Sequence, residues 1–170
     1  AEINGVSHLL EHMAFKGTKR RSALEIAVEM ENVGGHLNAY TSRDATVYYA
    51  TVLKENVNLA LDIIADILLH SEFNEDELER ERAVVLQEIG QANDTPDDII
   101  FDRFQETAYP DQALGRPILG TTAIVGQMPR DILLAYMKAQ YGAGRMILSA
   151  AGNLDHDDLV RCAERVFKNV

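Results

Sequence analysis

The sequence contains a single cysteine, Cys162, so its 170 residues hold no disulfide framework, which fits a reducing compartment. The setting of this cysteine is helical, and there a thiol serves as a small buried hydrophobe rather than as a nucleophile. Long apolar runs are also lacking. The longest, from Ile63 to Leu69, is broken by Asp66 and falls short of the roughly 20 residues that a membrane helix needs. We therefore expect no membrane span.

Basic charge is scarce as well, with 16 Lys and Arg against 27 Asp and Glu and a net charge of -11. This balance argues against nucleic acid as a partner. A negative field favours cationic substrates, although acidic charge also simply keeps a protein in solution. The chain starts at Ala1 with neither a Met nor a basic and apolar leader, which leaves an upstream targeting segment open.

The apolar pattern predicts mostly helices. A period of 3.6 favours helices over residues 4–15, 22–33, 74–91, 128–141 and 155–168, with two more that begin at 56 and 95. Ser22 with Glu25 forms a capping box, and Asn74 is an N-cap with Glu at the third position. The apolar stripe expected for the second helix is Leu24, Ala27, Met30 and Val33.

A few strands interrupt the helices. Residues 36–41 and 46–53 are rich in Thr, Val and Tyr and are joined by a short polar link, which indicates a hairpin. Residues 145–151 predict a third strand, and 113–120 an ordered loop. The order indicates an α+β fold, with helices packed on a mostly antiparallel sheet. Three strands make a thin sheet, so we expect further strands outside this chain.

The sharpest chemical signal is His8-Leu-Leu-Glu11-His12. On a helix, residues four apart point the same way, so His8 and His12 can hold one Zn²⁺. Glu11 lies slightly off that line, where it can face a zinc-activated water as the general base. The alternative is a pair of surface histidines that happen to be four apart.

Catalytic zinc takes three protein ligands, so a further acid is needed. Glu81 and Glu88 lie seven apart on one face of the predicted 74–91 helix. Glu88 sits late in this helix among apolar residues, where an acid is locally unfavourable. A metal explains it, and so does a buried salt bridge.

Five segments carry a family resemblance: the stretch from His8 to Thr18, Gly34-Gly35, Asn38 to Ser42, the run from Glu81 to Ile89, and Leu114 to Gly120. They resemble the pitrilysin/insulysin family of inverted-motif zinc peptidases, and in particular the β-subunit of mitochondrial processing peptidase and its bacterial relatives. Glu88 falls 76 positions after His12, where the family has its third zinc ligand.

The resemblance implies roles for individual residues. His8, His12 and Glu88 would bind Zn²⁺, Glu11 would be the general base, and Glu81 would support the site by orienting a ligand, unless it is a solvated helix acid.

The resemblance also implies a binding surface. Asn38, Ala39 and Tyr40 match the family's edge strand, on which an extended peptide lies by β-augmentation. Phe15 and Tyr40 match aromatic positions that line the pocket after the cut bond, although either can equally be plain core. Main-chain pairing makes such binding largely independent of substrate sequence.

Against the family, residues 1–170 resemble a partial N-terminal zinc-binding peptidase domain, truncated at both ends. The opening strands and a C-terminal half are absent from it. That half, or a partner subunit, is implied to contribute an Arg and a Tyr near the cut bond. The resemblance places such a protein in the bacterial cytoplasm or the mitochondrial matrix.

The function expected is a zinc metalloendopeptidase that hydrolyses extended peptides or presequences. One alternative is a non-catalytic scaffold or partner subunit of the same family, or an inactive fragment. Such scaffolds lose motif residues, whereas this chain keeps all four. Another alternative is a structural zinc site in a binding module, which would require four protein ligands.

Overall fold

The computed structural model describes residues 2–168. They form two compact units that interleave along the chain. The first unit comprises residues 2–13, 40–47 and 73–136, and the second comprises 14–39, 48–72 and 137–168. Within the described residues, no helix combines the length and the apolar character needed to cross a membrane.

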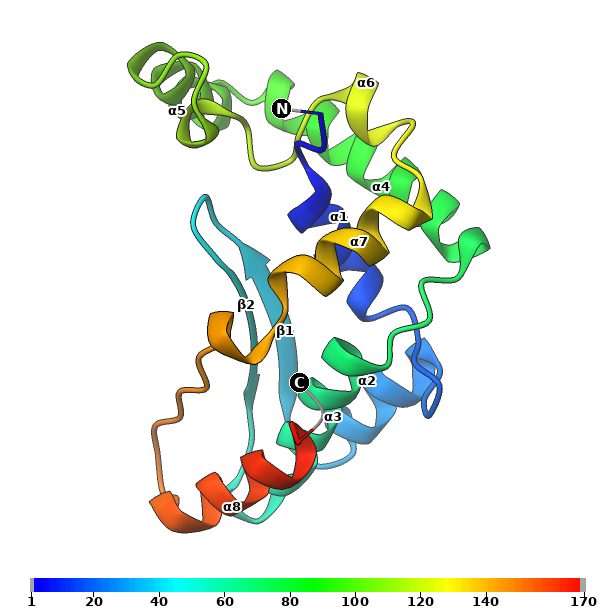
Figure 1. The fold of residues 1–170 in the computed structure, drawn as a ribbon, viewed down its shortest axis with the longest axis vertical. Helices are drawn as coiled ribbons and strands as arrows, with labels where there is room; N and C mark the ends of the chain where they lie inside the picture. The colour runs from blue at the N-terminus through cyan, green and yellow to red at the C-terminus, as the bar shows by residue number, and fades with distance from the viewer. Residues whose placement is uncertain (1, 169–170) are drawn as a thin grey trace. The chain divides into compact units, whose positions relative to one another are not determined.

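Helices dominate the chain, and one antiparallel hairpin of β1 and β2 is the sheet of the described residues (Figure 1). This arrangement confirms the predicted α+β class. The helices and strands are α1 (Val6–Ala14), α2 (Ala23–Glu31), β1 (His36–Thr41), β2 (Thr46–Thr51), α3 (Val57–Leu69), α4 (Glu75–Asp94), α5 (Pro96–Ala108), α6 (Thr122–Val125), α7 (Arg130–Gln140) and α8 (His156–Val166), with short 3₁₀ turns at 54–56, 113–115 and 143–145.

The core of the second unit lies between α2, α3 and the hairpin. Ile26 and Met30 of α2 pack with Ile63 and Ile67 of α3, and hairpin side chains such as Leu37 cover them. The predicted capping box at the start of α2 is present, since the Ser22 hydroxyl accepts from the Glu25 N–H and the Glu25 carboxylate accepts from the Ser22 N–H. The side chains of β1 alternate between exposed and partly buried, as expected for a strand, and Leu37 is one of the partly buried ones.

An ionic cluster anchors the segment between α1 and α2 to α3. Asp66 is fully buried and accepts hydrogen bonds from the Thr18 hydroxyl at 2.8 Å and from Arg21 Nη1 at 2.9 Å. Arg21 also reaches Asp62 and Glu29. A buried carboxylate is tolerated only when it is paired and hydrogen-bonded in this way. The turn that follows α1 is therefore fixed to the body of its unit.

In the first unit, α1 is held at its start by a close backbone approach. Gly5 has φ +90° and Gly120 has φ +81°, and a Cβ added to Gly120 would lie 2.6 Å from the Asn4 carbonyl oxygen. The Asn4 side chain donates to the Pro117 carbonyl at 3.0 Å. A side chain at either position would therefore clash with the opposite backbone. The 113–120 segment is an ordered loop, as expected.

Three details differ from the sequence-based expectations. The predicted strand over 145–151 is absent: Arg145 ends the 3₁₀ turn, residues 146–151 have no regular secondary structure, and Ile147 is 95% exposed. An apolar run becomes a strand only where a partner strand pairs with it. Over residues 2–168 the sheet therefore has two strands rather than three. In α2 the predicted stripe is wrong at Leu24, which is 72% exposed, and at Ala27, which is also exposed, while Ile26 is buried together with the predicted Met30. The short helix α6 was not anticipated.

Candidate metal centre

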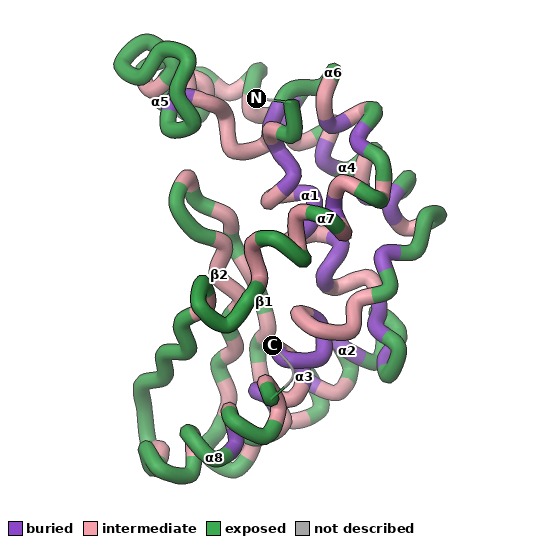
Figure 2. Tube along the Cα trace, in the orientation of Figure 1, coloured by how far each residue is buried: buried purple, intermediate pink, exposed green. Residues whose placement is uncertain are grey.

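Helix α1 carries core residues on one face and chemically active residues on the other. Leu9, Leu10 and Met13 are fully buried, as Figure 2 shows by the purple along α1. Since residues three and four apart share a helix face, His8, Glu11 and His12 gather on the opposite stripe. Packing of the apolar face thus sets where the His-x-x-Glu-His side chains point.

Helix α4 carries the two acidic residues of the candidate site, Glu81 and Glu88. The Asn74 side chain caps it by accepting from the Asp76 and Glu77 N–H groups, as predicted from the sequence. The buried stripe of α4 consists of Leu78, Glu81, Val85 and Ile89. Glu81 is only 7% exposed, which rules out the alternative of a solvated helix acid.

His8, His12 and Glu88 converge. Glu88 Oε2 lies 3.7 Å from His8 Nε2 and 3.5 Å from His12 Nε2. One ligand atom from each of the three residues lies within 4.8 Å of the others. Ligand atoms around a tetrahedral Zn²⁺ at about 2.0–2.1 Å would be roughly 3.3 Å apart. The two distances from Glu88 are close to that value, and the three atoms together would have to draw closer around an ion.

One carboxylate oxygen of Glu88 also points to a bound cation. Its Oε2 is buried and has no hydrogen-bond partner, although it faces two imidazole nitrogens. A buried carboxylate oxygen without a partner is costly, and such atoms in native proteins usually mark an ion or a catalytic role. The same three residues therefore fit a divalent cation in both geometry and charge.

The second nitrogens of the two histidines differ. His12 Nδ1 lies 3.0 Å from Glu81 Oε2. With Nδ1–H donated to this carboxylate, Nε2 keeps its lone pair directed toward Glu88. His8 Nδ1 is buried and has no hydrogen-bond partner. Glu81 is thus the side chain within hydrogen-bond distance of the second nitrogen of His12.

The electrostatics favour neutral imidazole at His8. Burial, and after it the charge of His12, lowers the pKa of His8 from 6.5 to about 4. At neutral pH this ring is therefore unprotonated, which is the form that binds a metal. The ring centroids of His8 and His12 lie 4.7 Å apart in an edge-on arrangement.

Glu11 has a different environment from Glu81 and Glu88. Burial raises the pKa of its carboxyl, a shift that a hydrogen bond from Thr41 partly offsets. The Thr41 hydroxyl donates to Glu11 Oε2 at 2.5 Å. Sequence reasoning placed Thr41 at the end of the predicted substrate strand but gave it no contact with Glu11, because a threonine at an inward strand position is indistinguishable from a packing residue until the fold places it.

The residues predicted to bind substrate lie mainly in the second unit. Asn38 and Ala39 are on β1, and the Asn38 side-chain oxygen accepts from the Ala39 N–H at 2.8 Å. Tyr40, which the first unit includes, is 54% exposed. Phe15 packs against Tyr48, with ring centroids 6.2 Å apart, and covers the core of its unit, so its alternative as a core residue has direct support.

Comparison with known proteins identifies the class to which this fold and cluster belong. Residues 1–122 match the family described as insulinase (peptidase family M16), and residues 127–170 match the one described as the peptidase M16 inactive domain. The chain belongs to peptidase family M16. The family resemblance inferred from the five sequence segments is thereby confirmed.

Particular relatives share much of its sequence. An uncharacterized zinc protease from Rickettsia felis is 48% identical over all of this chain and 41% of its own length. The human mitochondrial-processing peptidase subunit beta is 46% identical over 96% of this chain and 34% of its own length. A protease from Helicobacter pylori has a solved structure that superposes with a TM-score of 0.94 at 25% identity, over 99% of this chain and 41% of that one. This chain thus spans about two fifths or less of these relatives.

Proposed function

We propose that this chain supplies the zinc-binding and catalytic part of a metalloendopeptidase that hydrolyses extended peptides or presequences. The observation that carries the proposal is the convergence of His8, His12 and Glu88, with Glu88 Oε2 buried and without a hydrogen-bond partner. The names of the relatives, zinc protease and processing peptidase, support the same reading. A scaffold without activity would need none of this arrangement.

In this proposal His8, His12 and Glu88 hold Zn²⁺, which supplies Lewis acidity toward a water and the scissile carbonyl. Glu11 accepts the proton of the attacking water on the carboxylate oxygen that Thr41 does not hold, and later donates it to the leaving amine. Its raised pKa suits a group that must take up and release a proton. Glu81 keeps the His12 ring oriented.

For the substrate we propose an extended peptide added alongside β1 near Asn38, Ala39 and Tyr40, with an aromatic contribution from Phe15. In the described residues β1 pairs only with β2, so its other edge offers backbone groups to an incoming strand. The Asn38 side chain already accepts from the Ala39 N–H. A substrate strand would have to displace that bond.

We further propose that activity needs a C-terminal half or a partner subunit, because this chain spans about two fifths of its relatives. The relatives come from bacteria and from mitochondria. On that basis the bacterial cytoplasm or the mitochondrial matrix is the proposed compartment.

The decisive experiment is the metal content of the full-length protein with Glu88→Gln. Removal of the third ligand should lower zinc affinity by at least ten-fold, while the fold, read by circular dichroism, stays intact. Glu75→Gln is the matched control, since Glu75 is an exposed acid in the first turn of the same helix. Equal zinc binding in Glu88→Gln and the wild type, or no zinc in a metal-replete wild type, would contradict the proposal.

A further inference from the structure

Thr41 lies at the end of β1, where it meets the proposed general base. Its hydroxyl donates to Glu11 Oε2 at 2.5 Å, and its Oγ1 lies 3.2 Å from the hydroxyl oxygen of Thr46 on β2. Both threonines are half-buried. The contact thus joins the hairpin to the face of α1 that carries His8 and His12.

The direction of this chain of hydrogen bonds follows from counting protons. An ionised carboxylate only accepts hydrogen bonds, so Thr41 must donate its single hydroxyl proton to the bond with Glu11. The bond between the two threonines is then made with the proton of Thr46. The order is Thr46 to Thr41 to Glu11, and each donor polarises the next.

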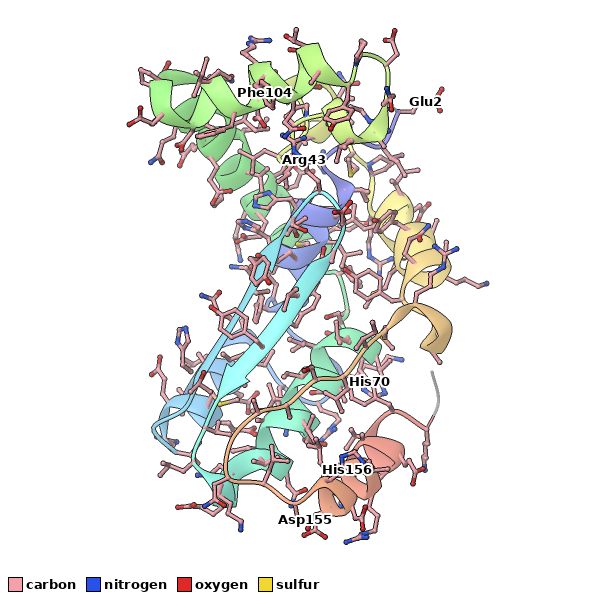
Figure 3. The ribbon with its side chains drawn as sticks, turned by 90° about the vertical axis from the view of Figure 1, so that its left-hand side faces the viewer. Glu2, Arg43, His70, Phe104, Asp155 and His156 are labelled. Atoms are coloured by element: carbon pink, nitrogen blue, oxygen red, sulfur yellow. The ribbon has the colours of Figure 1, made fainter. Side chains whose placement is uncertain are left out.

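The turn between β1 and β2 is anchored to other parts of its unit, which holds Thr41 and Thr46 in place. Arg43, labelled at the tip in Figure 3, donates to Asp102 Oδ1 at 2.7 Å and to the carbonyl of Leu114 at 3.0 Å. It also donates to the carbonyl of Arg116. The turn is closed by the Ser42 N–H bond to the Ala45 carbonyl at 2.8 Å. Thr41 lies next to this turn, so the position of its hydroxyl group is fixed.

We propose that Thr41 is a positioning residue for Glu11, with Thr46 as its support. The inference rests on the proposed function, in that Glu11 is the group that takes the proton. By holding Oε2, Thr41 fixes the carboxylate plane and leaves the other oxygen for the attacking water. Misplacement of a catalytic group by about 1 Å can cost on the order of 100-fold in rate, so one hydrogen bond to a rotatable carboxylate matters.

The test compares three variants in the full-length protein. Thr41→Val removes the hydroxyl but keeps the β-branched shape, and we expect kcat to fall about 10- to 100-fold with KM and zinc content unchanged. Thr41→Ser keeps the hydroxyl and should retain most of kcat. Thr46→Val should give a smaller loss than Thr41→Val. Thr51→Val, at an exposed threonine at the end of β2, is the control and should leave kcat unchanged.

A structural readout separates this inference from the proposed function. In a crystal structure of Thr41→Val, we expect the Glu11 carboxylate to turn away from its wild-type position, whereas Thr41→Ser keeps it. If Glu11 stays in place, or if Thr41→Val keeps wild-type kcat, or if the Ser and Val variants lose kcat equally, the inference is wrong. If the wild type binds no zinc or cuts no peptide, the proposed function fails, and the Glu11 orientation still decides whether Thr41 positions it.

Discussion

The two histidines of the site have equivalent places on α1 but different support. His12 has Glu81 at 3.0 Å from its Nδ1, whereas His8 Nδ1 is buried with no hydrogen-bond partner. Since the second nitrogen fixes the tautomer and ring orientation of a ligating histidine, His12 is the better oriented of the two.

The clearest prediction at the residue scale concerns Glu11. In the full-length protein, Glu11→Gln should keep zinc but lose cleavage by about 10²–10⁴-fold, because glutamine preserves shape yet cannot accept a proton. Metal analysis and single-turnover cleavage of a presequence-like peptide measure the two effects. Near-normal turnover would remove Glu11 from the role of general base.

His8 gives a prediction for stability against pH in the metal-free protein. The pKa of His8 is about 4 in the folded protein and takes its ordinary value of 6.5 in the unfolded chain. Between these two pH values, the unfolded chain binds a proton that the folded chain does not. Stability should therefore fall as the pH drops from 6.5 toward 4, by up to about 3 kcal/mol from this group. Urea unfolding with chelator at several pH values measures it.

His8→Gln isolates this contribution. The pKa of Glu11 is raised by burial, so its effect on stability has the opposite sign. Its contribution to the free energy of unfolding is lost as the pH rises through its folded pKa. The difference between the wild type and His8→Gln removes the Glu11 effect. Parallel pH profiles for the two proteins would show that His8 is not held neutral.

At the scale of elements, the site depends on where α1 begins. The start of α1 is fixed by the contact of Gly5 with the loop at Gly120, whose added Cβ would also lie 2.8 Å from the Gly5 Cα. A shift of this start would displace His8 and His12, the ligands proposed on this helix. We therefore expect the loop to affect the proposed metal centre without contributing a ligand to it.

Gly120→Ala tests this dependence. The substitution combines a backbone clash with φ +81°, and we expect a loss of about 1–3 kcal/mol in stability together with weaker zinc binding. Gly144→Ala is the control, because nothing lies within 4 Å of its added Cβ. Thermal unfolding and zinc titration measure the effects, and equal behaviour of both variants would refute the argument.

Local chemistry made some of the fold predictable. The caps at Ser22 and Asn74 were foreseen because a cap depends on residues within one helical turn. The convergence of Glu88 with the two histidines was expected from the family resemblance and agrees with the geometry, although metal binding there stays a prediction. The contact of Thr41 with Glu11 was beyond reach, because a hydrogen bond across 30 positions has no local signature.

Strand and surface assignments fared less well. Residues 146–151 have strand composition, yet strand formation depends on a neighbour that composition cannot supply. Leu24 fitted a helical stripe that tertiary packing assigned to Ile26 instead. On α5, Phe101 and Phe104 are 70% and 62% exposed, the opposite of what their hydrophobicity suggests.

At the scale of the whole molecule, the net charge of -11 bears on the choice of substrate. A negative field raises the local concentration of cationic peptides. It is screened beyond about 8 Å at physiological salt, so the effect should be modest. It adds to main-chain pairing rather than replacing it.

We predict that Arg-containing peptides are cut faster than Ala-substituted ones at low salt, and that this difference shrinks at high salt. The ratio of kcat/KM values for a matched peptide pair in the full-length protein measures it. A ratio of one, unaffected by salt, would leave the strand-pairing proposal standing and remove the electrostatic one.

The proposed ligands on α1 and α4 come from distant parts of the chain, with His12 and Glu88 separated by 76 positions. An ion held by both would close a long loop, and loop closure restricts the unfolded chain more strongly the longer the loop. With Cys162 as the only cysteine, the chain has no covalent way to make such a cross-link. The metal would then serve as a reversible staple, and slower amide exchange in both helices on metal binding would be its signature.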